Sequence, residues 1–363
     1  MFNDVYKQRK VFVTGHTGFK GSWLVLWLLH LGANVVGYSL KPSTQPNHFD
    51  VLALDLESIL DDIRHTMRVC QSIESFRPDI VFHLAAQSLV RKSYGDPVQT
   101  FETNVIGTVN VFEACRKIDS VRAIVNITSD KCYENQEWIW GYRESDPLGG
   151  HDPYSASKGC AELVTASYRE SYFPLNEYRK THQTLVVSVR AGNVVGGGDW
   201  GEDRLVPDIM RAASQNEKVI IRNPEATRPW QHVLEPLAGY LLLGQRLLEG
   251  KKEFSGAWNF GPDDDGHKNV LNVVEELQTH WDSIDFKILS DEKYPHEARL
   301  LKLDCSKARA ELGWRPVWSS STTFAKTARW YREFYESCMV LSQRDLAEYI
   351  SDAQQKHVSW STR

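Results

Sequence analysis

The chain has 363 residues, enough for two domains or for one large sheet domain that carries a smaller lobe. Its 25% charged residues, 42% hydrophobic residues and net charge of -5 are typical of a soluble protein without the basic face that nucleic-acid binding requires. We therefore expect no nucleic acid among its partners.

The first ten residues are mainly polar, and the longest apolar run, residues 23–31, is too short to span a membrane. These features predict a cytoplasmic protein with no secretory signal and no membrane partner. The six cysteines lie far apart without a Cys-x-x-Cys pair, which predicts reduced thiols and no metal site.

A short strand is predicted at residues 10–14, and a glycine-rich loop leads from it into a helix at residues 22–31. Its spacing, Gly-x-x-Gly-x-x-Gly, lets the backbone turn tightly and approach a pyrophosphate at the free amides of the helix N-terminus. An incidental tight turn is the alternative, but the position between strand and helix favours a dinucleotide site. The residues expected to bind the cofactor here are Thr14, Gly15, Thr17, Gly18, Phe19, Lys20 and Gly21.

The second strand, residues 34–39, ends without the carboxylate that usually holds the adenosine ribose. Ser39, Leu40 and Lys41 stand there instead. This weakens the case for NAD over NADP, because Lys41 can meet a 2′-phosphate, although it can equally be solvated.

Two later strand ends supply further candidates for the cofactor site. Asp62 and Ile63 follow a segment at residues 56–60 and are candidates for adenine contacts. The small residues after the fourth strand, residues 80–84, let the backbone pass close to the cofactor. The candidates there are Leu84, Ala85, Ala86 and Gln87.

Residues 96–117 are predicted to form a long helix with Asn104 inside it. An asparagine in mid-helix either faces water or uses its amide for a buried backbone group, and we favour the second interpretation. The next apolar run, residues 123–128, predicts a buried strand that contributes Ile127 to the cofactor site. Its tip delivers Ser129, Asp130 and Lys131 into a cleft.

A helical pattern at residues 152–172 places Tyr154 and Lys158 four residues apart on one face. An ammonium near a phenol favours the phenolate and lowers the pKa of the phenol toward use as a base. Such a pair is more often a solvated helix face, so its catalytic interpretation depends on the glycine-rich loop. The long loop before it, residues 133–151, is predicted to be a lid or an oligomer contact.

A sixth strand at residues 183–190 is expected to complete the sheet, after which the pattern loosens. Residues 191–200 are predicted to form a flexible loop, Arg204 opens a helix, and residues 321–336 form a further amphipathic helix. Arginines cluster in residues 222–232 and 295–299, where they suit either phosphate binding and base stacking or surface ion pairing.

The expected fold is α/β, with a Rossmann-like doubly wound parallel sheet and a smaller mixed α/β C-terminal substrate lobe. We assign residues 1–192 to the NAD-binding domain and residues 193–345 mainly to the lobe, with some segments returning to the sheet. Residues 346–363 are assigned to a C-terminal tail.

Several of these motifs together resemble the extended short-chain dehydrogenase/reductase family. They are Thr14-Gly15-x-x-Gly18-x-x-Gly21, Leu84-Ala85-Ala86-Gln87, Ser129, Tyr154-x-x-x-Lys158 and Arg190-Ala191-Gly192-Asn193. The resemblance covers roughly residues 10–345 and implies NAD as cofactor. Further runs, such as Thr-Ser-Asp-Lys-Cys-Tyr and Arg-Pro-Trp-Gln-His-Val, are similar to the members that dehydrate CDP-glucose.

That resemblance implies roles for the residues already singled out. Tyr154, tuned by Lys158 and helped by Ser129, takes the proton of the sugar 4-hydroxyl while hydride passes to NAD. Asp130 is the candidate acid for the departing 6-hydroxyl. Lys131 is either the base at position 5 or a stabiliser of the enolate, and relatives acting on dTDP-glucose have glutamate there. Simple epimerases of the family need neither Asp130 nor Lys131, which favours a dehydratase.

The resemblance also implies partners. The substrate contacts would be Gln87, Asn193, Arg204, Leu205, Arg222, Arg228, His232, His296 and Arg299. A homodimer or homotetramer would form through the helices at residues 97–117 and 152–172, and the product would serve O-antigen (lipopolysaccharide) synthesis. The alternatives are another nucleotide-sugar dehydratase, a 4-epimerase, or a non-catalytic NAD(H)-sensing Rossmann protein.

Overall fold

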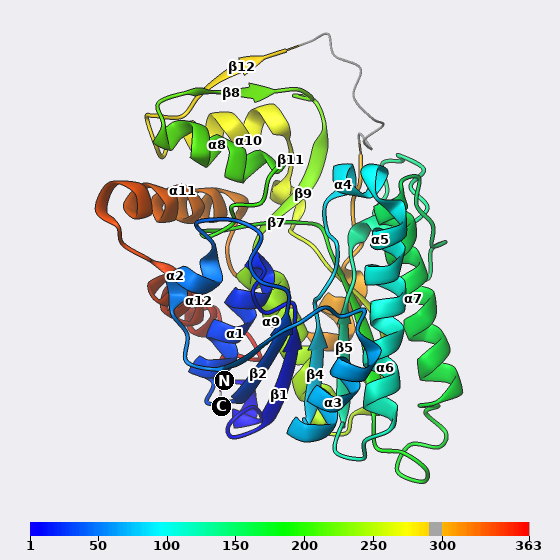
Figure 1. Ribbon diagram of the computed structural model, residues 1–363. Coiled ribbons are helices and arrows are strands. Elements are labelled where there is room, and N and C mark those ends of the chain that lie inside the picture. Colours follow the sequence, from blue (N-terminus) through cyan, green and yellow to red (C-terminus); the bar gives the residue numbers. More distant parts are fainter. Residues whose placement is uncertain (290–299, 363) are drawn as a thin grey trace.

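The computed structural model describes residues 1–289 and 300–362. Within these residues, seven parallel strands form one sheet in the order β10-β6-β5-β4-β1-β2-β3 (Figure 1). The strands are β1 (Lys10–Thr14), β2 (Asn34–Ser39), β3 (Glu57–Leu60), β4 (Ile80–His83), β5 (Ala123–Ile127), β6 (Leu185–Ala191) and β10 (Gly256–Phe260). The strand order reverses between β1 and β4, and ligands bind at such a switch point. The expected doubly wound sheet is confirmed.

Helices cover both faces of this sheet, which is why its strands read as continuous apolar runs. In β1, Val11 and Val13 face one core, whereas Phe12 faces the other. The first core packs against α1 (Phe19–His30) and α9 (Leu234–Leu248), and the second against α3 (Thr66–Phe76), α6 (Gly107–Arg116) and α7 (Pro153–Ser171). Shorter helices are α2 (His48–Leu52), α4 (Val90–Gly95) and α5 (Pro97–Phe101).

A smaller lobe lies above the carboxyl ends of the strands in Figure 1. It has a three-stranded sheet and a two-stranded parallel sheet, and its own core includes Trp281 and Trp330. The elements are β7 (Asn193–Val195), β8 (Lys218–Ile221), β9 (Thr227–His232), β11 (His267–Asn269), β12 (Asp285–Ile288), α8 (Leu205–Ser214), α10 (Val270–Gln278) and α11 (Ser320–Ser337).

Short 3-10 and π-helical turns complete the described elements. The 3-10 turns are Phe2–Asp4, Asp130–Cys132, Lys252–Phe254 and Asp264–Gly266, and the π turns are Glu102–Ile106 and Ala308–Leu312. No helix of the described residues has both the length and the apolar character needed to cross a membrane. All six cysteines are free thiols, as expected.

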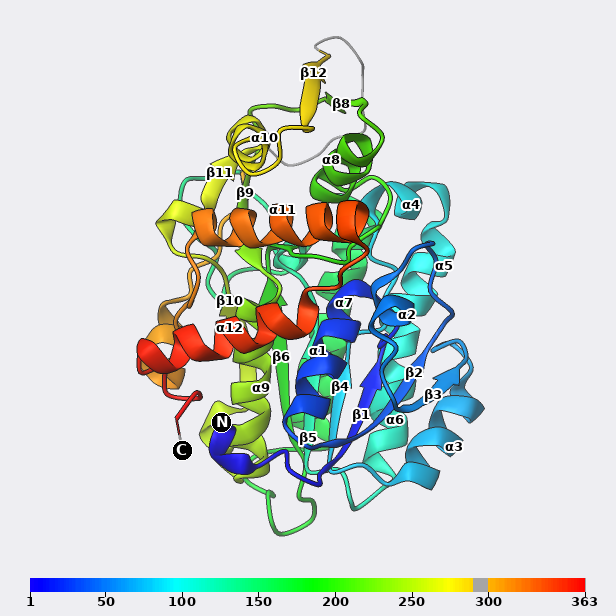
Figure 2. The same cartoon turned by 90° about the vertical axis from the view of Figure 1, so that its left-hand side faces the viewer.

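β10 from the second half of the chain pairs with β6, so a later segment returns to the sheet. Two parts of the chain differ from expectation. The expected loop at residues 191–200 instead includes the short strand β7, which pairs with β9. The expected C-terminal tail is instead helix α12 (Ser342–Gln355) followed by a packed end, and Figure 2 shows it lying across the outer side of the first helical layer. Its apolar residues recur at helical spacing, as Leu346, Tyr349 and Ala353 do, and this pattern indicates a buried face.

The C-terminal end closes an aromatic cluster with the first residues of the chain. Trp360 is 1% exposed and stacks on Phe2, with ring centroids 5.2 Å apart. We expect Trp360→Ala to lower the free energy of unfolding by about 3–5 kcal/mol in urea titrations, because it leaves a large cavity. Trp140, which is 66% exposed, is the control, and its change to alanine should stay within about 0.5 kcal/mol. Equal losses of unfolding free energy in the two variants would show that the C-terminal segment around Trp360 does not belong to the core.

Candidate active site

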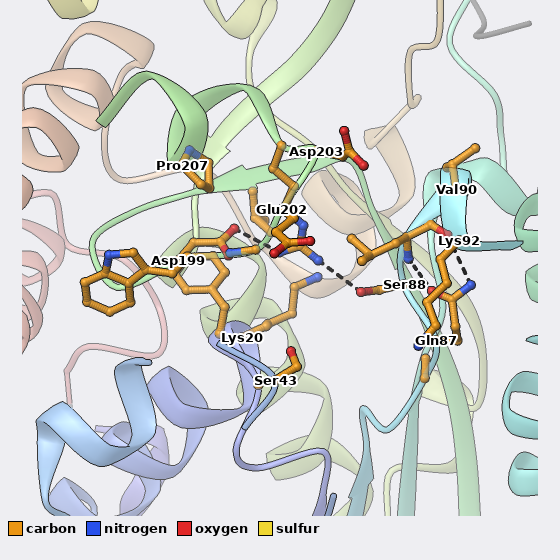
Figure 3. Close-up of a pocket in the computed structure, with 18 of the residues that line it drawn as sticks. Lys20, Ser43, Gln87, Ser88, Val90, Lys92, Asp199, Glu202, Asp203 and Pro207 are labelled. Carbon is orange, nitrogen blue, oxygen red and sulfur yellow. Dashed lines mark hydrogen bonds and ion pairs between the residues drawn. The ribbon is translucent and has the colours of Figure 1, made fainter. Parts of the chain in front are cut away.

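A cleft of about 1130 Å³ runs along the carboxyl ends of the strands, between the sheet and the smaller lobe. Its walls come from the loop after β1, the ends of β4 and β5, the start of α7, and the lobe elements β7, α8 and β8. Figure 3 shows part of this lining, with Lys20 and Ser43 from the sheet domain opposite Asp203 and Pro207 from the lobe.

The glycine-rich loop forms one wall, and its backbone leaves no room for a side chain at Gly15 or Gly21. A Cβ atom on Gly21 would lie 2.1 Å from the carbonyl oxygen of Gly15, and one on Gly15 would lie 2.7 Å from the amide nitrogen of Ala85. Helix α1 starts within this loop, at Phe19, and its N-cap residue Gly18 offers no side-chain hydrogen bond. Such a cradle fits a pyrophosphate.

Thr14 does not serve the cofactor as expected. Its side chain is fully buried, and its Oγ1 accepts hydrogen bonds from the amides of Leu84 and Ala85 at 3.1 Å each. It also contacts Nδ1 of His83 at 2.7 Å. Thr14 therefore ties the end of β4 to β1, and Leu84, Ala85 and Ala86 line the cleft.

The residues predicted for the adenosine end of the cofactor site lie along the same cleft. Ser39, Asp62 and Ile63 all line the cleft, together with Lys41. The Oγ of Ser39 lies 2.8 Å from Oγ1 of Thr17, and Asp62 is ion-paired with Arg64 at 2.8 Å. That carboxylate keeps a low pKa because Arg64 donates hydrogen bonds to it.

Asn104 acts through Gln87 rather than on the cofactor. It sits in a π-helical turn, accepts a hydrogen bond from the Gln87 amide at 2.8 Å, and donates to the Gln87 carbonyl at 3.0 Å and to Ser157 Oγ at 2.8 Å. The interpretation that its amide serves a buried backbone group is confirmed. Its assignment as a cofactor contact is corrected, because it is 2% exposed behind the cleft wall.

The turn after β5 presents the candidate catalytic residues. Ser129 Oγ accepts a hydrogen bond from the Lys131 amide at 3.2 Å and donates one to Asp130 Oδ1 at 3.0 Å. Asp130 is 2% exposed, and its Oδ2 has no hydrogen-bond partner among the described residues. Burial raises the pKa of this carboxyl, although the charge of Lys131 counteracts the rise. A buried acid with one uncommitted oxygen therefore faces the cleft.

Tyr154 and Lys158 lie at the start of α7, which Asp152 caps by accepting a hydrogen bond from the Ser155 amide at 2.9 Å. They are 7% and 6% exposed, and both line the cleft. Burial raises the pKa of Tyr154 to about 12, and burial lowers the pKa of Lys158 to about 8. The expected lowering of the phenol pKa by Lys158 is thus wrong for this structure, because desolvation of the phenol dominates.

The lobe supplies the substrate side of the cleft. Asn193, Leu205, Arg222 and Arg228 line it, and so does Arg204, which joins the two sides by pairing with Asp199 at 2.8 Å and donating to Ser88 Oγ at 3.0 Å (Figure 3). Gln87 also lines it, but its side-chain amide donates to Leu89 and Thr100.

His232 is a correction, because it is fully buried between Trp23 and Trp318, at centroid distances of 5.9 and 4.7 Å. The apolar surroundings lower its pKa to about 3, so it stays neutral in the core. His296 and Arg299 lie outside the described residues.

The model of the GDP-mannose 4,6 dehydratase family matches residues 12–327. The chain belongs to this family. A CDP-glucose 4,6-dehydratase of Salmonella typhimurium is 50% identical, over 96% of this chain and 98% of the relative. The resemblance inferred from the sequence motifs is thereby confirmed.

Solved structures agree with this family assignment. The dTDP-glucose 4,6-dehydratase DesIV of Streptomyces venezuelae, solved with NAD bound, has a TM-score of 0.73 at 25% identity, covering 89% of this chain and 97% of DesIV. Pal of Bacillus thuringiensis has a TM-score of 0.76 at 27% identity, covering 90% and 99%.

Sequence reasoning missed one buried carboxylate that supports the cleft from behind. Glu162 follows Lys158 by one helical turn, bonds Thr128 and Ser188, and pairs with Arg190 at 2.8 Å, with both charged side chains almost fully buried. The spacing of four residues was the available signal. By holding Thr128, Glu162 fixes the strand end that carries Ser129 and Asp130.

We expect Gly21→Ala to weaken NAD binding about tenfold or more, measured by calorimetric titration, since its Cβ would displace the loop backbone. Gly95→Ala is the matched control, because a Cβ there meets no atom of the described residues within 4 Å. NAD affinity equal to that of the control would place the pyrophosphate elsewhere.

Proposed function

We propose that this chain converts CDP-glucose to CDP-4-dehydro-6-deoxyglucose and water, with NAD as its cofactor. The observation that carries the proposal is Asp130, a buried carboxyl with a raised pKa that shares one cleft with Tyr154 and the glycine-rich loop. A dehydratase needs such an acid to expel a hydroxyl group, whereas an epimerase does not. The 50% identity with a CDP-glucose 4,6-dehydratase supports the same conclusion, and it also supports cytosine as the base of the nucleotide sugar.

The glycine cradle, Ser39 and Asp62 would hold NAD along the carboxyl ends of β1, β2 and β4. The chemistry that NAD supplies when bound is reversible hydride transfer, out of sugar position 4 and back to position 6. Tyr154 can take the proton of the 4-hydroxyl only as the phenolate. The hydrogen bond from Ser129 and the positive charge of Lys158 one helical turn away oppose the effect of burial and favour that form. Ser129 hydrogen-bonds the same sugar oxygen. The resulting ketone acidifies the proton at position 5.

Elimination then needs a base at position 5 and an acid at position 6. Asp130 gives its proton to the departing 6-hydroxyl, which leaves as water. Lys131 lines the cleft one residue further and is near enough to act on the Asp130 carboxyl electrostatically. It is our candidate either for the base that takes the proton from position 5 and returns it when hydride reaches position 6, or for a cation that stabilises the enolate.

We also propose a cytoplasmic homodimer or homotetramer that serves O-antigen synthesis. Support for the assembly comes from exposed apolar residues on α5 and α7, where Val98 is 67% and Leu163 59% exposed.

The test is incubation of the purified protein and NAD with CDP-, dTDP-, UDP- and GDP-linked sugars. The expected result is a 4-keto-6-deoxy product from CDP-glucose, detected by its alkaline chromophore and by the mass loss of one water. A parallel series with NADP tests the cofactor choice. An epimerised sugar without a ketone, or preference for another base, would contradict the proposal.

A further inference from the structure

Two arginines from opposite sides of the cleft converge on one carboxylate oxygen. Arg91 lies on α4 of the sheet domain, and Arg222 follows β8 of the lobe. The Nη1 of Arg91 is 2.8 Å from Oδ1 of Asp203, and the Nη1 of Arg222 is 3.9 Å from the same atom. Asp203 belongs to the loop before α8, and Figure 3 shows it above the cleft. All three residues line the cleft.

Guanidinium groups that meet from two sides form a site for an anion with several oxygens, such as a phosphate group. In this structure the anion is a carboxylate of the chain itself. The side chains of Arg91, Asp203 and Arg222 are 41%, 45% and 38% exposed, and exposed ion pairs add little to stability. The carboxylate can therefore be exchanged for a better anion at small cost.

The neighbouring pair of Arg204 and Asp199 has a different character. Asp199 is 8% exposed, holds Arg204 at 2.8 Å and also accepts the amide hydrogen of Gly201. This pair is built into the lobe, whereas Asp203 stands in an exposed loop between two cations of different domains. The exchangeable position is thus that of Asp203.

We propose that Arg91 is a ligand of the substrate diphosphate together with Arg222, and that Asp203 is an internal competitor that leaves both arginines when the diphosphate binds. This inference rests on the proposed function, since it takes the ligand to be a nucleoside diphosphate sugar. Binding exchanges one carboxylate for phosphoryl oxygens and links the sheet domain to the lobe through the ligand.

The test is calorimetric titration of the NAD-loaded protein with CDP. Asp203→Asn removes the competing charge, and asparagine tolerates the left-handed backbone at this position, where φ is 56°. We expect it to tighten CDP binding about fivefold. Glu202→Gln is the matched control, because it removes the same charge one residue away. A CDP affinity of Asp203→Asn that is weaker than wild type, or equal to that of the control, overturns the competitor role and indicates a structural latch.

Arg91→Gln should weaken CDP binding about tenfold and reduce its dependence on salt, since one charged contact to phosphate is lost. Lys92→Gln is its control on the same helix. Cytidine, which has no phosphate, should bind the wild type and the Arg91 variant equally. Equal CDP affinities of the Arg91 and Lys92 variants would overturn the assignment of Arg91.

Turnover of CDP-glucose by the wild-type protein separates this inference from the proposed function. Absence of turnover with the expected changes in CDP affinity would refute the dehydratase proposal and leave the diphosphate site standing. Turnover of CDP-glucose, together with CDP affinities that the substitutions leave unchanged, would support the dehydratase proposal and refute the diphosphate site.

Discussion

Tyr154→Phe is expected to lower the turnover of CDP-glucose roughly a hundredfold to ten-thousandfold, the range that one group in general acid–base catalysis contributes. The change removes only the phenol oxygen, which is the proposed acceptor of the 4-hydroxyl proton. The ring fills a buried position, with the side chain 7% exposed, and phenylalanine keeps that volume. NAD affinity should therefore stay close to that of the wild type.

The measurements are steady-state turnover and NAD titration of the same preparations. Tyr172→Phe is the control, because Tyr172 caps the far end of α7 and is 48% exposed. It should leave both quantities unchanged. If Tyr154→Phe lost NAD together with activity, the tyrosine would be structural and the catalytic assignment would fail.

Local signals were sufficient to predict several strands and helices of the sheet domain. The glycine spacing, the apolar strands and the capped start of α7 are each encoded within a few residues, so β1, β5 and α7 appear where they were expected. The resemblance of motifs predicted only part of the substrate side of the cleft. Asn193, Arg204 and Arg222 line the cleft, whereas His232, from the same arginine-rich segment, is enclosed by two tryptophans.

Properties that depend on depth or on distant segments could not be predicted in this way. Helical spacing places Lys158 one turn from Tyr154 but does not reveal how deeply the phenol is buried, and burial decides its pKa. Likewise, the fit of Trp360 against Phe2 depends on both ends of the chain meeting. The contact between Arg91 and Asp203 joins residues of two domains, and no motif connects them.

Asp130→Asn should slow elimination more than the first oxidation, and reduce turnover about a hundredfold. Asparagine can still accept the hydrogen bond from Ser129, which spans 3.0 Å, but it cannot give a proton to the 6-hydroxyl. Substrate that carries deuterium at position 4 distinguishes the steps. In the variant, breaking the bond at position 4 no longer limits the rate, so the isotope effect on kcat should fall toward one.

Stability provides the control for this variant, and its sign follows from the pKa. Because burial raises the pKa of Asp130 in the folded protein, ionisation of the carboxyl destabilises the fold as pH rises through that value. Asparagine does not ionise, so the variant should melt at or above the wild-type temperature at neutral and alkaline pH, with the difference vanishing in acid. A stable variant with slow turnover and an undiminished isotope effect would mean that Asp130 serves the oxidation step, and the acid would have to be sought among the other residues of the cleft.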